Sequence, residues 1–429
     1  MIPATSQLPY GASPPSSWKV VPLKYLAVLS NGFAFKSESR QGTGTPIIRI
    51  ENLNGSDTFN HSSLALDDRY KVTAGDLLFS WSGNPGTSFG PFRWVKGGSY
   101  YLNQHIFNVS VHGCDKSWLY WSLRAATHWI ERELTSGMIG MVHVTKAELA
   151  NVPIPIPPIE EQRRIADFLD AETARIDALI DKREEMSELV AQRNQAVIRD
   201  QLRGGGKREP SDNATVPWIP GVPQHWDTAP LRYVSRIQRG ASPRPIDDPV
   251  YFDDKGSHAW VRISDVTASE KYLTETTQRL SSRGRSLSVS LKPGELFVSI
   301  AASVGKPIIT RIPCCIHDGF VAIRCPVVDV EFLYYLLLLG DAFKGLGKIG
   351  TQLNLNSETV GSIKIPIPPK DEQKRIVSVL NEDRRASQRL KLDLKRQINL
   401  LSERRQALIT AAVTGQIDVS TASGRGIGE

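Results

Sequence analysis

The sequence predicts a two-fold pseudo-symmetric protein of mixed α/β (α+β) class, with two globular domains joined by two long antiparallel coiled-coil helices. Three observations predict this fold. The segment IPIPPIEEQRRI at 154–165 returns as IPIPPKDEQKRI at 365–376, an offset of 211 residues (373 − 162) at the shared glutamine. After each copy comes a long stretch without Pro or Gly, at 160–203 and 370–414. Before each copy come short β-rich runs separated by turn residues.

The repeat also covers the globular domains. Trp18 corresponds to Trp226, and the run GDLLFS at 75–80 corresponds to GELFVS at 294–299. Each copy has the size of a domain, and the small insertions between copies belong in surface loops. The predicted boundaries are 1–152 for the first globular domain, 153–204 for a Pro-rich turn and the first helix, 205–363 for a linker and the second globular domain, 364–415 for the second turn and helix, and 416–429 for a disordered tail.

Within the globular domains the signals are shorter. Predicted strands lie at 46–50, 76–80 and 105–111 in the first domain, and at 259–263, 295–300 and 319–325 in the second. Helical patterns lie at 116–134 and 330–344. Because strands and helices do not alternate strictly, we expect an irregular α/β or α+β module.

The two long helices have clear ends and a clear apolar face. Prolines precede each helix, carboxylates occupy each first turn, and Gly204 and Gly415 stand where a C-terminal cap would fall. Apolar residues recur at heptad spacing, interrupted by Arg183 and Ser387, which predicts a coiled-coil seam. The helix-pairing residues are predicted to be Ile165, Leu169, Ile176, Leu179, Val190, Val197, Ile376, Leu380, Leu390, Leu394, Leu401 and Leu408.

Charge favours pairing of these two helices with each other. Residues 160–203 contain 8 basic and 11 acidic residues, a net charge of −3, and residues 370–414 contain 11 basic and 6 acidic residues, a net charge of +5. Opposite signs favour a mixed intramolecular pair over pairs of like helices. The alternative is two solvated helices whose charges have no part in pairing.

Composition bounds the class of protein. The chain has 429 residues, a net charge of +7 and a pI of about 9.1, which suits a partner that carries phosphates. Four cysteines without CxxC spacing predict neither a disulfide framework nor a zinc site, and favour a reducing compartment. There is no secretory h-region at the start, and the longest apolar run, 332–339, is too short to span a bilayer. We therefore expect a cytoplasmic protein without a membrane role.

Motifs of catalysis are missing from the sequence. It contains no GxxxxGK[ST] loop, no GxSxG elbow and no HExxH, and the glycines at 204–206 suit a linker. The PIPP segments also lack the Asn and the aromatic residue of an amino-methyltransferase tetrapeptide. Asp253, Asp254 and Lys255 resemble the acidic-x-Lys element of a metal-dependent nuclease, although an exposed turn also explains them. We therefore predict no catalytic residue, metal ion or cofactor in this chain, with a DNA nuclease or a coiled-coil scaffold as alternatives.

Polar residues at equivalent places in the two domains are candidates for nucleic-acid contact. Arg49 and Arg262 follow equivalent strands, and small polar loops begin at Ser80 and Ser299. Arginine and asparagine can make paired hydrogen bonds to guanine and adenine. For each residue singly, a surface or structural role is the alternative. The candidates are Arg49, Asn52, Ser82, Asn84, Arg93, Lys146, Arg262, Asp265, Ser303, Lys306, Lys348, Gln352, Asn354 and Asn356.

The doubled IPIPPxxEQxRI turn with its long helix, preceded each time by a globular domain, resembles the specificity subunit of type I restriction–modification systems over nearly the whole chain. The resemblance implies two target recognition domains, each reading one half of a bipartite site in double-stranded DNA. It implies helices that act as a spacer and dock two methyltransferase subunits, which bind S-adenosylmethionine and methylate adenine. A restriction subunit would supply translocation and cleavage, while the specificity subunit catalyses nothing. The resemblance does not carry base-contacting residues over to this sequence.

Overall fold

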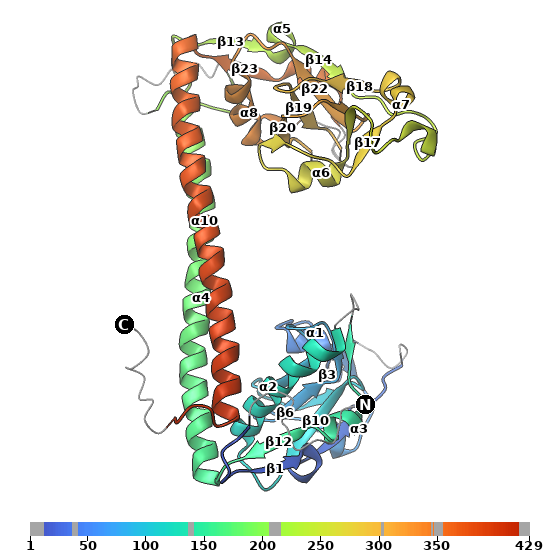
Figure 1. The fold of residues 1–429 in the computed structure, drawn as a ribbon, viewed down its shortest axis with the longest axis vertical. Coiled ribbons are helices and arrows are strands. Elements are labelled where there is room, and N and C mark those ends of the chain that lie inside the picture. Colours follow the sequence, from blue (N-terminus) through green and yellow to red (C-terminus); the bar gives the residue numbers. More distant parts are fainter. Residues whose placement is uncertain are drawn as a thin grey trace. The chain divides into compact units, whose positions relative to one another are not determined.

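The structure is a computed structural model that describes residues 13–36, 42–135, 141–205, 216–301, 304–344, 346 and 355–419. The chain forms two compact units. The first unit comprises Met1–Glu184 with Lys395–Glu429, and the second comprises Glu185–Leu394. Each unit therefore contains one globular domain, the first part of one long helix and the last part of the other (Figure 1). This division differs from the domain boundaries that the sequence predicts, because contacts between the helices join segments that are distant along the chain.

The described part of the first unit is built on two four-stranded sheets, with strand orders β2-β10-β6-β8 and β4-β3-β9-β5. Their bounds are β2 Ala27–Asn31, β10 Ile106–Val111, β6 Leu77–Ser80, β8 Gly90–Arg93, β4 Asn60–Ser62, β3 Thr45–Ile48, β9 Tyr100–Leu102 and β5 Lys71–Val72. Two short pairs join β1 Lys19–Pro22 to β12 Pro153–Ile156 and β7 Ser82–Gly83 to β11 Val142–His143. The helices of this domain are η1 Leu23–Tyr25, α1 Ile50–Leu53, η3 Asp68–Tyr70, α2 Lys116–Thr135 and α3 Lys146–Ala150.

The described part of the second unit repeats this plan with strand orders β14-β22-β19-β20-β16 and β17-β15-β21-β18. Their bounds are β14 Arg236–Arg239, β22 Phe320–Arg324, β19 Leu296–Ser299, β20 Pro307–Thr310, β16 Tyr272–Leu273, β17 Gln278–Leu280, β15 His258–Val261, β21 Cys314–Ile316 and β18 Val289–Leu291. Strand β13 Asp227–Pro230 pairs with β23 Lys364–Ile367. The helices are α5 Leu231–Val234, η4 Pro249–Tyr251, α6 Ile263–Ala268, α7 Ser282–Ser286, α8 Val330–Leu338, η5 Asp341–Phe343 and α9 Ser357–Ser362.

The strand registers of the two domains are equivalent. In the first domain β3 runs parallel to β9, with Ile48 opposite Leu102, and in the second β15 runs parallel to β21, with Val261 opposite Ile316. Likewise, β10 meets β6 as β22 meets β19. The second domain adds strand β16, which runs parallel to β20 at the edge of its sheet. The predicted internal repeat is therefore a repeat of structure.

The predicted strands and the first predicted helix are confirmed, with most ends shifted by one or two residues. The prediction of a helix over 330–344 is wrong at its end, because α8 stops at Leu338 and Gly340 adopts a left-handed conformation with φ +70°. The predicted Pro-rich turns also need correction. Their Ile-Pro-Ile segments form strands β12 and β23, and proline is compatible with such two-stranded pairs because only alternate residues donate hydrogen bonds to the partner.

The two long helices are α4 Ile159–Gln201 and α10 Lys370–Val413, close to the predicted bounds. As predicted, Gly204 and Gly415 follow them with positive φ, at +94° and +70°. Within each unit, a segment of α4 lies beside a segment of α10 (Figure 1). In the second unit the order is antiparallel, because Asn194 meets Asp383 whereas the later residues of α4 share a core with earlier residues of α10.

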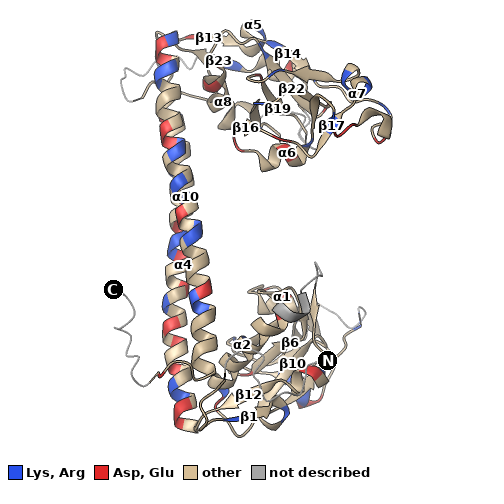
Figure 2. Ribbon diagram, viewed as in Figure 1, with Lys and Arg blue, Asp and Glu red and all other residues tan. Residues whose placement is uncertain are grey.

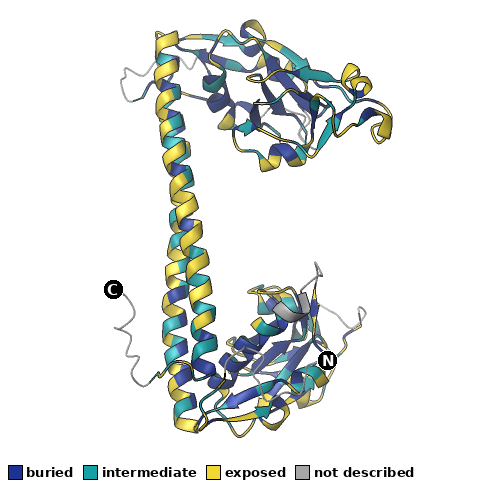
Figure 3. Cartoon of the chain, viewed as in Figure 1, coloured by how far each residue is buried: buried dark blue, intermediate teal, exposed yellow. Residues whose placement is uncertain are grey.

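The predicted seam is only partly buried (Figure 3). It is closed near the globular domains, where Ile165, Leu169, Ile376 and Leu380 are buried, and Ile176 and Leu394 are buried further along the helices. Val190, Val197, Leu401 and Leu408 are half-buried. Leu179 and Leu390 are exposed by 42 % and 43 %, so their assignment to a buried seam is wrong. A two-helix pair covers only a narrow stripe of each helix, and these two side chains lie outside it.

Charge pairs join the helices within both units (Figure 2). In the first unit Asp177 of α4 pairs with Arg405 of α10, in the sense that the net charges predict. In the second unit the sense is reversed, since Arg193 of α4 lies 2.7 Å from Asp383 of α10. Individual exposed ion pairs contribute little, so we assign the pairing mainly to the apolar contacts.

A buried glutamine fastens each globular domain to the start of its helix. The Gln162 side chain donates to the Pro157 carbonyl at 2.9 Å and accepts from the Asp115 N–H at 2.8 Å. Asp115 in turn caps α2 through the N–H of Trp118. In the second unit, Gln373 makes the same pair of bonds to the Pro368 carbonyl and the Asp329 N–H. The glutamine of the IPIPPxxEQxRI motif is therefore a structural clamp.

Each globular domain also contacts the end of the other helix. A Cβ atom placed on Gly415, after α10, would lie 2.4 Å from Pro15, and one on Gly204, after α4, would lie 2.7 Å from Pro223. The chain after Gly415 continues this contact, because the Gln416 side chain donates to the Ser13 carbonyl and Ile417 and Val419 pack on the core. The prediction of a disordered tail is therefore wrong for 416–419, and 420–429 lie outside the described residues.

In the part of the chain that the structure describes, no helix combines the length and apolar character needed to cross a membrane.

Replacing either clamp glutamine by alanine should leave a backbone N–H and a buried carbonyl without partners. We expect Gln162→Ala and Gln373→Ala each to lower the free energy of unfolding by about 2 kcal/mol. Denaturant unfolding followed by circular dichroism measures this loss. Gln397→Ala and Gln195→Ala change exposed glutamines of the long helices, one in each unit, and should change stability by less than about 0.5 kcal/mol. Equal losses in all four variants would contradict the clamp.

Candidate nucleic-acid interface

Two equivalent turns, between β9 and β10 and between β21 and β22, stand at the same place in the two domains. In the first turn, the His105 N–H donates to the Asn103 side chain at 3.4 Å. In the second turn, the Gly319 N–H donates to His317 Nδ1 at 2.9 Å. The strand registers make these positions equivalent, so one backbone bond is preserved with two different acceptors.

A glycine brings a further loop against each turn. A Cβ atom on Gly32 would lie 2.2 Å from the Asn103 carbonyl oxygen, and one on Gly240 would lie 2.0 Å from the His317 carbonyl oxygen. Only glycine permits so close an approach of two backbones. The loops that follow these two glycines therefore begin directly beside the turns.

Arginines gather around the turn of the second domain, in a group that we call the arginine cluster: Arg239, Ser242, Arg244, Arg262, His317 and Asp318. Asp318 is its centre. Arg239 donates to the Asp318 carbonyl at 2.9 Å, while Ser242 and Arg244 donate to its carboxylate at 2.8 and 3.3 Å. The hydrogen bond from Ser242, with His317 and Arg244 nearby, lowers the pKa of Asp318. Asp318 thus holds two exposed guanidinium groups on one surface, Arg239 through its carbonyl and Arg244 through its carboxylate.

The charge of His317 is controlled by its surroundings. Burial lowers the pKa of His317, Asp318 opposes this shift, and the positive charge of Arg262 adds to it. The ring also packs against Trp260 and Phe320. A neutral ring that accepts at Nδ1 carries its proton on Nε2, so it can donate one hydrogen bond.

The first domain has aromatic rings where the second has arginines, in a group that we call the aromatic cluster: Trp81, Gln104, His105 and His143. Trp81 stacks on Phe107 with ring centroids 6.0 Å apart and lies 5.2 Å from His105 and 6.2 Å from His143. Its Nε1–H donates to the Gln104 carbonyl, which leaves the exposed Gln104 amide beside His105. Gln104 occupies the position of Asp318, and Ile300 occupies that of Trp81.

Of the predicted site residues, one of the two equivalent arginines that follow β3 and β15 reaches these surfaces. Arg262 is exposed within the arginine cluster, whereas Arg49 is half-buried and pairs with Glu51 at 3.1 Å. Asn84 and Lys146 are exposed in the first domain. The sequence reasoning did not single out Arg239, Arg244, Trp81 or Gln104. The only local signal was the three arginines within 236–244.

Asn52 and Asp265 are not available to a base. Both are buried, and both accept from the backbone N–H three residues earlier, of Arg49 at 2.9 Å and of Arg262 at 2.8 Å. The Asn52 amide also donates to the carbonyls of Ser56 and Thr58. These side chains cap α1 and α6, so the prediction that they contact nucleic acid is wrong.

Ser82, Arg93 and Asn356 are also occupied within the fold. Ser82 is buried in β7, where its hydroxyl lies 3.2 Å from the Met141 sulfur. Arg93 donates to Asp170 of α4 at 2.7 Å, which fastens the domain to the helix. Asn356 caps α9 by accepting from the Thr359 N–H at 2.7 Å. The predicted roles of Ser82 and Arg93 are therefore replaced by structural ones.

Other predicted residues are less informative. Lys306 is half-buried, and its ammonium group donates to the Thr267 carbonyl at 3.1 Å. Burial lowers the pKa of Lys306, while Glu270 opposes the shift. Ser303, Lys348, Gln352 and Asn354 lie outside the described residues.

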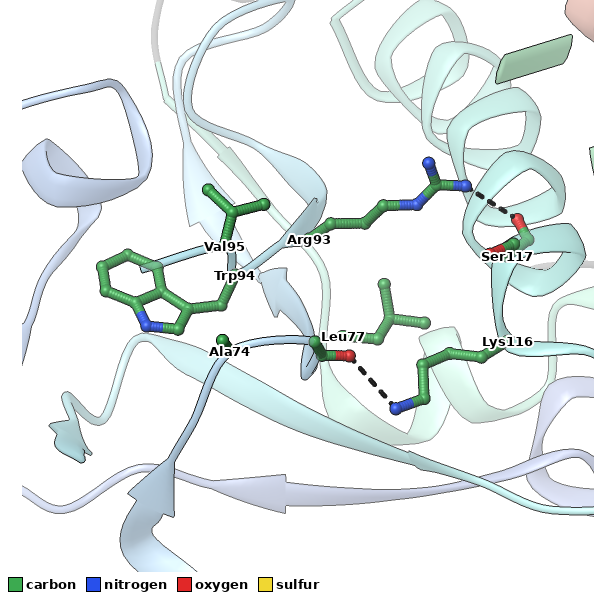
Figure 4. Close-up of a pocket in the computed structure, with 8 residues that line it drawn as sticks. Ala74, Leu77, Arg93, Trp94, Val95, Lys116 and Ser117 are labelled. Atoms are coloured by element: carbon green, nitrogen blue, oxygen red, sulfur yellow. Dashed lines mark hydrogen bonds between the residues drawn. The ribbon is translucent and has the colours of Figure 1, made fainter. Parts of the chain in front are cut away.

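A pocket of about 340 Å³ lies beside Arg93 in the first domain (Figure 4). Arg93 and Lys116 line it together with Ala74, Leu77 and Trp94. Both cations donate to backbone carbonyls at the pocket, Arg93 to Ser117 and Lys116 to Gly75. The two cationic side chains at the pocket therefore already donate hydrogen bonds within the fold.

The family follows from comparison with known proteins. Residues 15–186 and 223–399 match the family described as Type I restriction modification DNA specificity domain. The chain belongs to this family. The two matched segments correspond to the two copies of the internal repeat, and its relatives are specificity subunits.

Specificity subunits from two different organisms are similar to this chain over most of their length. The chain is 22% identical over 383 residues to the type I restriction enzyme EcoBI specificity subunit of Escherichia coli, covering 84% of this chain and 78% of that protein. It is 23% identical over 434 residues to the putative MjaX specificity subunit of Methanocaldococcus jannaschii, covering 95% of each.

Solved structures share the fold of this specificity-domain protein. A chain from a study of complex assembly and conformational transition in a type I restriction–modification system has a TM-score of 0.71 at 20% identity, covering 94% of this chain and 100% of that one. The HsdS subunit of Thermoanaerobacter tengcongensis has a TM-score of 0.51 at 19% identity, covering 97% and 100%.

The nuclease alternative draws no support from the acidic pair. The Asp253 carboxylate accepts from the Lys255 N–H at 3.0 Å, as in a surface turn. Among the residues that the structure describes, no group of three or more His, Cys, Asp or Glu side chains is placed to hold a metal ion.

His317→Asn should make the protein less sensitive to acid, since asparagine is the equivalent residue of the first domain and keeps the acceptor. The fold lowers the pKa of His317, so the unfolded chain binds the proton first as the pH falls below about 6.5, and stability is lost in that range. We expect the loss of unfolding free energy between pH 7.5 and 5.5 to be smaller in the variant. Denaturant unfolding at the two pH values measures this, with the exposed His112→Asn as control. An unchanged loss would contradict the assignment.

Proposed function

We propose that this chain is the DNA-reading subunit of a type I restriction–modification complex, and that each unit reads one half of a bipartite site. The observation that carries the proposal is the pair of equivalent turns. Their backbone bond is preserved, whereas the arginine cluster stands at one turn and the aromatic cluster at the other. A preserved frame with changed side chains suits two readers of different base sequences.

The arginine cluster has the chemistry of direct base readout. A guanidinium group can donate two parallel hydrogen bonds to the O6 and N7 atoms of guanine, and it also binds phosphate. Asp318 holds Arg239 and Arg244 in place, which reduces the entropy lost on binding. We therefore expect the half-site of the second unit to include guanine.

The aromatic cluster offers a different chemistry. The Gln104 amide can make paired hydrogen bonds to the N6 and N7 atoms of adenine, and the rings provide apolar contact for a thymine methyl group. Lys146, exposed at the start of α3, suits a phosphate contact. We therefore expect the first unit to prefer adenine and thymine.

The long helices would act as the spacer and as the docking surface for two methyltransferase subunits. Exposed leucines support a partner there, because Leu189, Leu392 and Leu400 are exposed by 52 %, 67 % and 54 %. In this proposal the methyltransferase subunits bind S-adenosylmethionine and methylate adenine, and restriction subunits join the same complex. The present chain binds no cofactor and supplies no catalytic group.

Joining two readers through stiff helices explains selectivity for a split site. Once one unit is bound, the second binds at a high effective concentration, provided that the gap between the half-sites fits. We expect half-sites about one turn of DNA apart, centre to centre.

The test is to co-express the chain with the methyltransferase subunit of its genomic neighbourhood, purify the complex and map adenine methylation on random DNA by single-molecule sequencing. Methylation at one split motif supports the proposal and identifies both half-sites. A stable complex that methylates no motif favours the scaffold alternative. Failure to form a complex would overturn the docking role, and Mg²⁺-dependent cutting by the isolated chain would favour the nuclease.

Arg262→Ala should relax the preference at one or more bases of a single half-site. Loss of a bidentate base contact costs about 1–3 kcal/mol of discrimination. Methylation mapping measures the relaxation, and the other half-site should be unchanged. Arg236→Ala removes an exposed arginine at the far end of β14 from Arg239 and should leave both half-sites unchanged. Relaxation of both half-sites by Arg262→Ala would contradict the division of labour.

Deleting one heptad from each helix, residues 180–186 and 394–400, should change the gap and preserve the half-sites. Seven residues shorten a helix by about 10 Å, which is about three base pairs. The contacts of Asp177 with Arg405 and of Asn194 with Asp383 lie outside the deletions. Methylation mapping of the shortened chain gives the new gap, and the same gap as in the full chain would refute the spacer role.

A further inference from the structure

A lysine without exposed side-chain surface joins the globular domain of the second unit to α10. The Lys271 ammonium group lies 2.6 Å from Asn381 Oδ1 on α10 and 3.1 Å from Glu331 Oε2 on α8, and its side chain is 0% exposed. The rings of Tyr334 and Tyr335 surround it, with centroids 5.3 and 4.6 Å away. We call these five residues the second-unit joint.

Every polar group of this joint is used. The Asn381 amide donates to Glu331 at 2.6 Å, and the Tyr335 hydroxyl donates to Asn381 at 2.8 Å. The Tyr272 hydroxyl donates to the second oxygen of Glu331. Burial lowers the pKa of Lys271, but Glu331 opposes this shift; burial would raise the pKa of Glu331, but its hydrogen bonds and Lys271 lower it. The joint is a satisfied ion pair that links the residue before β16 to α8 and α10.

The first unit has an equivalent joint, in which the cation and the carboxylate come from other positions. Arg93 lies over Tyr120 and Trp121, 4.2 and 5.5 Å from the ring centroids, and donates to Asp170 of α4 at 2.7 Å. Trp121 also donates to Asp170, as Tyr335 does to Asn381. Tyr120 and Trp121 are the repeat equivalents of Tyr334 and Tyr335. Arg93, Tyr120, Trp121 and Asp170 form the first-unit joint.

The difference between the joints is systematic. Asp170 and Asn381 are equivalent at the offset of 211 residues, so the carboxylate stands on the long helix in one unit and an amide stands there in the other. In the second unit Glu331 of α8 supplies the carboxylate instead. The cation has moved as well, because Ile309 occupies the place of Arg93 and the added strand β16 brings Lys271.

Burying such a pair, as the second unit does, is a poor way to gain stability; in the first unit the Arg93 and Asp170 side chains stay 34% and 41% exposed. Desolvating an ammonium and a carboxylate costs several kcal/mol, and apolar residues of similar volume often serve as well or better. Directed bonds, in contrast, hold one relative geometry and disfavour slipped ones. That both units place a cation, a carboxyl group and an aromatic pair at the contact with the helix therefore points to geometry as the property maintained.

We propose that the two joints fix the orientation of each globular domain on its long helix and thereby set which gap between half-sites the protein accepts. Lys271, Glu331, Asn381, Arg93 and Asp170 are positioning residues that do not touch DNA. The consequence for the gap rests on the proposed function, whereas the orientation itself can be measured on the isolated chain.

The first experiment measures the orientation directly. A spin label on the exposed Cys325 of the domain and a second on Lys391→Cys of α10, both in the second unit, report their distance distribution in the full chain, with Cys114 replaced by alanine. Wild type should give one narrow distribution. Glu331→Gln leaves the buried ammonium without a carboxylate and should at least double its width.

A compensating change makes the test specific. Glu331→Gln with Asn381→Asp moves the carboxylate onto the helix, which is the arrangement of the first unit, and should restore the narrow distribution. Lys271→Met combined with Glu331→Gln removes both charges and fills the site with an apolar side chain, so it should keep the unfolding midpoint while the distribution broadens. Lys292→Met changes an exposed lysine of the same domain and should have no effect. Distributions of wild-type width in both Glu331→Gln and the double variant Lys271→Met, Glu331→Gln would overturn the proposal.

The second experiment measures the gap. The complex with methyltransferase subunits methylates a library in which the half-sites are constant and the gap varies. Glu331→Gln should reduce the preference for the best gap over its neighbours by about tenfold, and the added Asn381→Asp should restore it. A variant that is only unstable would lose methylation at every gap equally, and this would overturn the proposal. If the wild-type complex methylates no split site, the proposed function fails, while the distance measurement still decides the joint.

Discussion

The organisation of the whole chain depends on two buried glutamines, because each joins a globular domain to the first turn of a long helix and so fixes the direction in which the helix leaves the domain. Gln162 and Gln373 each bind one carbonyl before the helix and one N–H at the start of the domain's own helix. Because these bonds are buried, water cannot take the place of a lost partner. A buried carbonyl without a partner lowers the stability of the fold more than the loss of an exposed hydrogen bond does. The contacts of Pro15 with Gly415 and Pro223 with Gly204 add the end of the other helix to each unit.

Around this frame the two domains are free to differ. The parallel pairing of β3 with β9 and of β15 with β21 fixes where each turn stands, and Gly32 and Gly240 fix the neighbouring loop. None of these constraints acts on exposed side chains, so one turn carries arginines around Asp318 and the other carries Trp81 and Gln104. Two readers of different base sequences, as in the proposed function, need this separation of frame from surface. The chain's membership of the specificity-domain family is consistent with it.

The two long helices also use one part of their surface for packing and leave another part exposed. Near the globular domains their contact is apolar and buried, as at Leu169 and Leu380, whereas other leucines such as Leu392 stay exposed. The acidic partner lies on α4 in one ion pair and on α10 in the other, so net charge does not by itself explain why α4 packs against α10. The covalent link through the globular domains already brings the two helices together, which lowers the entropy that pairing would otherwise cost.

The sequence by itself determined the repeat, both long helices to within about two residues and six of the described strands. These depend on local signals, which for the helices are Pro before the helix, Gly after it and uninterrupted periodicity between. It could not determine which polar residues face outward. Ser82 and Arg93 look like surface groups in sequence, yet Met141 and Asp170, distant along the chain, contact them. Asn52 and Asp265 bind backbone groups close to them in sequence, but the fold also buries them. Nor could it assemble the arginine cluster, where Arg239 meets Asp318 across 79 residues. Those outcomes belong to the tertiary structure, because burial and hydrogen bonding depend on which distant segments the fold brings into contact.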